Sequence, residues 1–142
     1  MPRHLSVSLF VGAAAFIAVA CSSSTAPANL TGPYVGSYTM DSVTSSALKA
    51  DGLPNGTLKP PLFSGTLKLT SDSFFVALSG PFPAGIPQKD SGTFSISSSN
   101  QWTLAGTLFS GTGTGALVGS QLQITLTGGA ALGNLYGLFT KQ

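Results

Sequence analysis

The chain has 142 residues, enough for one domain with a substantial core, and it carries very little charge. Only 7% of its residues are charged, against about 25% in typical soluble domains, and the formal net charge is +2. Its lysines form no basic cluster, so we expect no nucleic-acid partner. After residue 20 there is no histidine, arginine or glutamate. Nucleophilic triads and zinc sites that need histidine are thereby excluded, and we expect neither enzyme activity nor a cofactor.

The first twenty residues have the layout of a secretory signal peptide. A basic pair, Arg3-His4, precedes the tract 5–20, which is almost wholly apolar and small. This tract is shorter than the roughly 20 apolar residues that a membrane-spanning helix needs. We therefore expect residues 1–20 to direct export and to be removed.

The only cysteine of the chain stands directly after this tract. The run Ala18-Val19-Ala20-Cys21 resembles the lipobox of bacterial lipoproteins, in which small residues precede a cysteine that is acylated on sulfur and becomes the first mature residue. A multiply acylated cysteine holds a protein stably on a membrane, since each buried CH₂ contributes about 0.8 kcal/mol. The resemblance implies an exported protein whose Cys21 carries palmitate or a similar acyl group. Its location would be the bacterial cell envelope, at the outer membrane if the organism has one.

Between the cysteine and the first strand the composition is small and polar. Residues 21–33 are rich in serine, threonine and alanine and include Pro27 and Pro33. Such a composition is typical of a flexible tether. We expect residues 21–33 to join the lipid anchor to a single folded domain, residues 34–142.

Within residues 34–142 apolar and polar residues alternate, as in Leu122 to Thr127. This period of two is typical of strands with one buried face, and no segment shows a convincing helical stripe. Turn-forming residues separate the alternating runs. They delimit eight strands near residues 34–45, 63–71, 73–80, 90–97, 100–109, 111–118, 120–127 and 133–141.

Two longer segments interrupt this rhythm. Residues 47–61 and 80–90 are rich in glycine and proline, which argues against regular structure. Loops of this length are often lids or binding loops, and the alternative is a passive connection. We interpret Asp51, which precedes Gly52, and Asp72, which is flanked by serines, as turn residues whose carboxylates cap nearby backbone N–H groups, whereas Asp90 stands beside Lys89 at the start of a predicted strand.

The strand pattern predicts an all-β fold, an antiparallel meander of about eight strands closed into an up-and-down barrel, with a β-sandwich as the alternative. Gly111, Gly113 and Gly115 stand at alternate strand positions and are expected to leave room for a bulky neighbour such as Trp102 or to let the sheet bend. Parity along the strands predicts the inward-facing residues Tyr38, Met40, Leu67, Leu69, Phe74, Val76, Leu78, Phe94, Ile96, Trp102, Leu104, Leu122, Ile124 and Leu126.

Several short motifs support the same fold. Gly36-Ser37-Tyr38, Leu53-Pro54, the S-G-T-L-x-L strand 64–69, Ser73-Phe74-Phe75 and the D-S-G-T-F run 90–94 together resemble lipocalin-like β-barrel domains of bacterial lipoproteins. The tryptophan of the lipocalin signature is replaced here by Tyr38. The resemblance implies a β-barrel whose interior can take a small molecule.

The predicted lumen is apolar, and two interpretations of it stay open. An eight-stranded barrel is either filled by its own side chains or just wide enough for one small ligand. A ligand there would be apolar, because an inward charge would lack a partner. It would contact Tyr38, Phe74, Phe94, Trp102, Leu104 and Ile124. In the other interpretation the domain has a packed core and a structural or interaction role.

Overall fold

The computed structural model describes residues 30–50, 53, 56–82, 87–129 and 131–142. The predicted signal peptide, Cys21 and most of the predicted tether lie outside these residues. The described part of the chain holds two short helical segments, η1 (Gly32–Tyr34) and α1 (Ser46–Ala50). Its strands are β1 (Gly36–Ser45), β2 (Thr57–Leu58), β3 (Ser64–Leu69), β4 (Ser73–Ser79), β5 (Lys89–Ile96), β6 (Trp102–Ala105), β7 (Ser110–Val118), β8 (Gln121–Gly129) and β9 (Gly133–Lys141).

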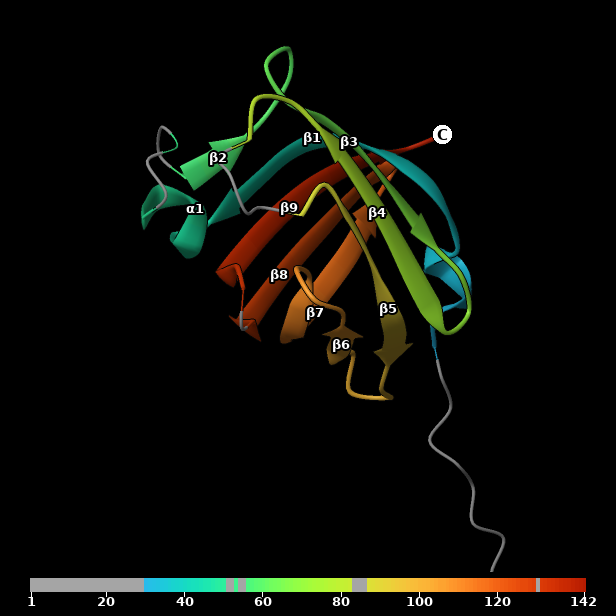
Figure 1. Ribbon diagram of the computed structural model, residues 1–142. Coiled ribbons are helices and arrows are strands. Elements are labelled where there is room, and N and C mark those ends of the chain that lie inside the picture. The colour runs from blue at the N-terminus through green and yellow to red at the C-terminus, as the bar shows by residue number, and fades with distance from the viewer. Residues whose placement is uncertain (1–29, 51–52, 54–55, 83–86, 130) are drawn as a thin grey trace, which may run out of the picture.

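The strands form a closed antiparallel barrel. From β3 to β9 each strand pairs with the next, and β1 pairs with β3 along one edge and with β9 along the other. Closure therefore joins the first and last strands, with Tyr38 opposite Lys141 and Ser45 opposite Leu135. Eight strands make the wall (Figure 1), and the two-residue β2 is an extra strand outside it on the far end of β1. This confirms the predicted all-β, up-and-down barrel, the architecture of lipocalins, over the sandwich.

Side-chain parity along the strands is as predicted. All fourteen residues expected to face inward are buried, from fully enclosed Tyr38 and Trp102 to Leu78, which is 7% exposed. The alternate positions carry mainly threonine, serine, glutamine and lysine on the outer surface. Period-two alternation therefore predicted both the strands and their faces, because each strand buries one face only.

The prediction that residues 47–61 lack regular structure is wrong in two places. The helix α1 forms at the end of β1 because the hydroxyl of Ser45 accepts its first backbone N–H groups, at 3.2 and 3.3 Å. The same hydroxyl donates to the carbonyl of Leu132 at 2.7 Å, which ties this helix cap to the barrel. Leu48 of α1 and Leu58 of β2 enter the core, each no more than 2% exposed. Burial of these two leucines stabilises a segment whose local composition favours turns.

The predicted strand 100–109 is too long. The strand β6 ends at Ala105, and residues 106–109 form a turn instead. The turn is closed by a backbone hydrogen bond from the Gly106 N–H to the Phe109 carbonyl, 3.1 Å long. The carboxylate of Asp90, in β5, also accepts hydrogen bonds from backbone N–H groups of this turn.

Different elements lie at the two ends of the barrel. The segment leading into β1, η1, lies at one end, and α1 and β2 lie at the other (Figure 1). The chain packs on the barrel from its first described residue, since the Leu30 N–H donates to the Ile96 carbonyl at 3.2 Å. Thr31 is 2% exposed and its hydroxyl donates to the carbonyl of Ser71, in the β3–β4 turn, at 2.7 Å. The chain that comes from Cys21 therefore joins the barrel beside the β3–β4 turn.

Candidate functional site

The six residues predicted to contact a ligand all point into the barrel, where none is more than 3% exposed: Tyr38, Phe74, Phe94, Trp102, Leu104 and Ile124. The ring of Trp102 lies at the centre of an aromatic group. Its centroid is 5.0 Å from that of Phe94, and Tyr34 packs edge-on against it at 4.7 Å. Both separations are typical of favourable aromatic pairs. Tyr34 is not among the predicted inward residues, although it shares the parity of Tyr38 in the predicted strand 34–45; in the structure it ends η1, and β1 begins two residues later.

The rings of the interior pack directly against the backbone of the wall. A Cβ atom added at Gly115 would lie only 2.3 Å from the ring of Trp102, which confirms that glycine in β7 makes room for this side chain. Added at Gly106 or Gly137, it would lie 2.5 Å from Phe74 or 2.6 Å from Phe139. The rings of Trp102 and Phe139 therefore lie against the backbone of the wall, and the ring of Phe74 lies against the turn 106–109.

Tyr38 links the interior to the η1 end. Its hydroxyl donates a hydrogen bond of 2.6 Å to the carbonyl of Tyr34. Burial raises the pKa of Tyr38 above the usual 10.0, and the neighbouring Tyr34 raises it further. The ammonium of Lys141 lies 5.8 Å from the centroid of the Tyr38 ring. Because charge on the hydroxyl is disfavoured, Tyr38 acts here as a neutral hydrogen-bond donor.

One polar atom of the interior is without a partner. The indole Nε1 of Trp102 is buried and has no hydrogen-bond acceptor among the described residues. An unpaired buried donor is costly and calls for an explanation. A small guest with an acceptor oxygen would satisfy it.

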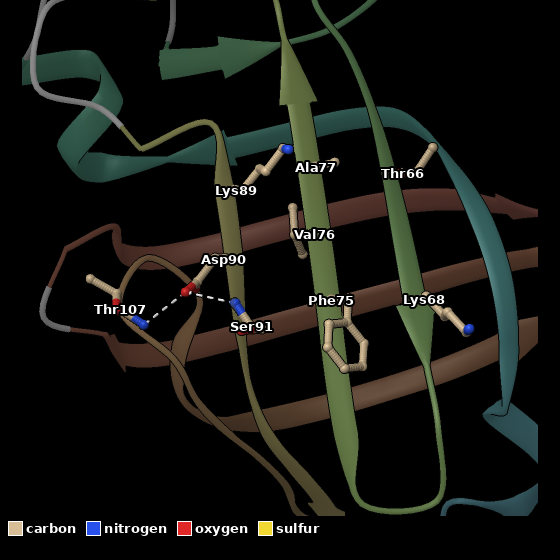
Figure 2. A pocket seen from close by; sticks show the side chains of 9 residues that line it. All are labelled: Thr66, Lys68, Phe75, Val76, Ala77, Lys89, Asp90, Ser91 and Thr107. Atoms are coloured by element: carbon tan, nitrogen blue, oxygen red, sulfur yellow. Dashed lines mark hydrogen bonds between the residues drawn. The ribbon is translucent and has the colours of Figure 1, made fainter.

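The described surface also carries an open groove of about 630 Å³ on the outside of the barrel, and we call it the β3–β5 groove. Figure 2 shows its lining: the outward side chains of three neighbouring strands surround the ring of Phe75, and Thr107 lies at one edge. Phe75 is 51% exposed, which is unusual for a phenylalanine in a strand. The groove is lined by Thr66, Lys68, Phe75, Val76, Ala77, Lys89, Asp90, Ser91 and Thr107.

Asp90 shapes the inner side of this groove. Its carboxylate accepts four backbone N–H groups, from Ser91 and Thr107 at 2.9 and 3.0 Å and from Leu108 and Phe109 at 2.8 and 2.6 Å. Asp90 therefore lies in a strand and caps a turn 17 to 19 residues away in the chain, a role that was not predicted. The sequence holds one signal for it, since Asp90 has the parity of the inward Phe94 and Ile96 in β5. Asp72 lies in the β3–β4 turn as predicted, but its carboxylate accepts from the hydroxyls of Thr70 and Ser73 and not from backbone N–H groups. Asp51 lies outside the described residues.

Two features, a metal site and a membrane-spanning helix, are not found in the described residues. No three histidine, cysteine, aspartate or glutamate side chains lie close enough together to hold a metal ion. No helix in the same part of the chain is long and apolar enough to cross a membrane.

The comparisons with known proteins add no relative. No protein-family model matches the chain, and neither the curated proteins nor the solved structures contain a significant match.

Proposed function

We propose that this chain is an exported lipoprotein, anchored to the cell envelope through an acylated Cys21, whose barrel is a rigid module that acts through its outer surface. The position of Cys21 after small residues and before a polar segment supports the anchor. The close contact of Trp102 and Phe139 with glycines of the wall, and of Phe74 with Gly106 in the turn 106–109, supports a filled interior and is the main observation behind the proposal. Packing that reaches the backbone at three places leaves the outer face as the surface for recognition.

Binding of an apolar fluorescent probe tests the filled interior. With a packed barrel, N-phenyl-1-naphthylamine causes no saturable change in the emission of Trp102, the only tryptophan. Phe74→Ala serves as the positive control with benzene in place of the larger probe, because the truncation opens a cavity that a benzene-sized molecule can enter. Stoichiometric binding by the unaltered protein at submicromolar probe, with quenching of Trp102, would show that the interior is a ligand site.

The anchor is tested on the protein extracted from membranes of cells that express the full chain. We expect mass spectrometry to find Cys21 as an acylated N-terminal residue, and Cys21→Ala to release the domain from the membrane fraction. An unmodified Cys21 in protein that is already soluble would contradict the anchor.

A second function is favoured by one observation, the unpaired Nε1 of Trp102. In this alternative the barrel holds one small, largely apolar guest whose acceptor oxygen takes the indole N–H. Native mass spectrometry of protein purified from its own host would then find a bound molecule at unit stoichiometry. Trp102→Phe removes the N–H while keeping an aromatic ring, and we expect it to weaken retention of that molecule. Protein that carries no copurified molecule would argue for the filled interior.

A further inference from the structure

The outward side chains of the β3–β5 groove form a regular array across three strands. One row runs from Lys68 on β3 through Phe75 on β4 to Ser91 on β5, since these residues are Cα partners. The next row runs from Thr66 through Ala77 to Lys89. The two lysines therefore lie diagonally across the array, and the small side chains beside them leave the ring of Phe75 uncovered (Figure 2).

The array has an excess of positive charge. Lys68 and Lys89 are both exposed, and neither is paired with a carboxylate of a described residue. The carboxylate of Asp90 belongs to the same groove but is directed at four backbone N–H groups of the barrel. A cationic surface with an exposed aromatic ring at its centre is complementary to an anionic interface that also accepts an apolar group.

The row with Lys68 and Phe75 lies toward the end of the barrel where the chain arrives from the predicted anchor, and Lys89, at the start of β5, lies farther from that end. Thr31 is hydrogen-bonded to Ser71 in the β3–β4 turn, and Phe75 follows Ser71 by four residues, about 13 Å along a strand. Residues 21–29 can span at most roughly 30 Å, at about 3.3–3.6 Å per residue. Leu30 and Val35, beside this entry point, are also exposed, at 46% and 40%. A membrane that holds Cys21 is therefore within reach of this face.

We propose that the outer face of β3, β4 and β5 docks on the anionic phospholipid surface to which Cys21 anchors the chain. Lys68 and Lys89 lie at the level of the phosphate groups, and Phe75 enters the interfacial layer between them. This inference rests on the proposed anchor for its orientation. The docking itself is a property of the folded domain, so it is measurable without the acyl chains.

The test is flotation of the mature chain, residues 21–142 with Cys21→Ser, on vesicles of phosphatidylcholine with or without an equal share of phosphatidylglycerol. We expect binding to the anionic vesicles that weakens steeply with salt, because exposed charges are screened over about 10 Å at 0.1 M. Lys68→Gln with Lys89→Gln should lower the partition coefficient by more than tenfold, at about fivefold for each lysine near an anionic surface. The matched control is Lys49→Gln with Lys59→Gln, which removes the same charge at the α1–β2 end and should leave binding within twofold.

A second measurement reports the orientation of the face. In a Trp102→Phe background, Phe75→Trp should give emission that shifts to the blue on anionic vesicles and is quenched by brominated lipid. The apolar control Val118→Trp, at a residue 63% exposed on β7, should show neither effect. Equal losses for the two lysine pairs, or an unshifted Phe75→Trp, would overturn the proposed face. Binding that a soluble polyanion abolishes at equal charge, with no emission shift, would indicate a polyanionic partner instead of a membrane.

The outcomes for the anchor and for the docking face are separable. If Cys21 is not acylated in cells but the Cys21→Ser chain binds anionic vesicles through Lys68 and Lys89, the anchor fails and the docking stands. If Cys21 is acylated and the lysine pair does not alter vesicle binding, the anchor stands and the docking is wrong.

Discussion

The two sides of the barrel are held together in different ways. From β7 through β8 and β9 to β1, each pair of strands is joined over seven Cα partners. The β5–β6 and β6–β7 pairs have only four partners each. The first half of β5 has no partner in β6, and there Asp90 holds the β6–β7 turn instead. Where the ladder of backbone hydrogen bonds is interrupted, one buried carboxylate takes its place as acceptor.

The outer faces of the two sides differ as well. The β3–β5 side presents Lys68, Lys89 and an exposed Phe75. The β7–β9 side presents uncharged threonine and glutamine around Tyr136, which is 42% exposed. A groove with two lysines therefore lies on the side with the shorter ladders, whereas the outer face around Tyr136 on the side with the long ladders is uncharged.

Removal of Trp102 should have the largest effect, because its ring joins the two sides: it belongs to β6 and packs on Phe94 of β5 and Gly115 of β7. We expect Trp102→Ala to lower the free energy of unfolding by about 3–5 kcal/mol. Urea unfolding followed by far-UV circular dichroism measures it, since the variant has no tryptophan. A loss under about 1 kcal/mol would contradict the burial of this ring.

The role of Asp90 is tested by Asp90→Asn. The amide turns one acceptor oxygen into a donor that faces backbone N–H groups, so we expect a loss of about 3 kcal/mol. Hydrogen exchange should accelerate at Leu108 and Phe109 before it does so in β8. Asp72→Asn is the matched control, because Asp72 accepts only from two exposed hydroxyls, and it should cost less than about 1 kcal/mol. Equal losses of unfolding free energy for Asp90→Asn and Asp72→Asn would show that Asp90 does not stabilise the β6–β7 turn in place of the missing β5–β6 hydrogen bonds.

The fit of the rings against the wall is tested by Gly115→Ala. The added methyl group would meet the ring of Trp102 at 2.3 Å, so we expect a loss of about 2 kcal/mol from overpacking. Gly32→Ala is the control, since no atom lies within 4 Å of the added Cβ, and it should be neutral or slightly stabilising. If Gly115→Ala were equally neutral, the interior would have room to rearrange, which would favour the ligand-binding alternative.

The smallest effect concerns the hydrogen bond of Tyr38. At neutral pH we expect Tyr38→Phe to cost about 1 kcal/mol. Because the pKa of Tyr38 is raised in the folded state, its stabilising contribution is complete below the unfolded pKa of about 10 and is lost as the pH rises through the folded pKa. The difference in unfolding free energy between the unaltered protein and Tyr38→Phe should therefore shrink above about pH 10. Spectrophotometric titration at alkaline pH should find that the ionisation lost in Tyr38→Phe has a pKa above the usual value of about 10.

Much of the fold could be predicted from local pattern. Alternation along the chain has the period of the pleated strand, so the strands, their inward faces and the closeness of glycine to Trp102 could be inferred residue by residue. The same parity predicts that the six residues of the proposed ligand site face the interior, and all six are buried there. Whether they contact each other or a guest depends on packing distances, and strand parity carries no information about those. The lipobox at Cys21 is likewise a purely local signal, and it remains a prediction from sequence.

The tertiary structure decided what depends on residues far apart in the chain. Closure pairs Tyr38 with Lys141, and Asp90 finds its donors in the turn 106–109, so neither partner is visible from the neighbouring sequence. The helix α1 forms in a segment with turn-like composition because burial of Leu48 outweighs weak local propensity. Lys68, Phe75 and Lys89 become neighbours only through the register of β3, β4 and β5. Alternation determines which way a side chain faces, but strand register determines which side chains meet, and register is set by the closed sheet as a whole.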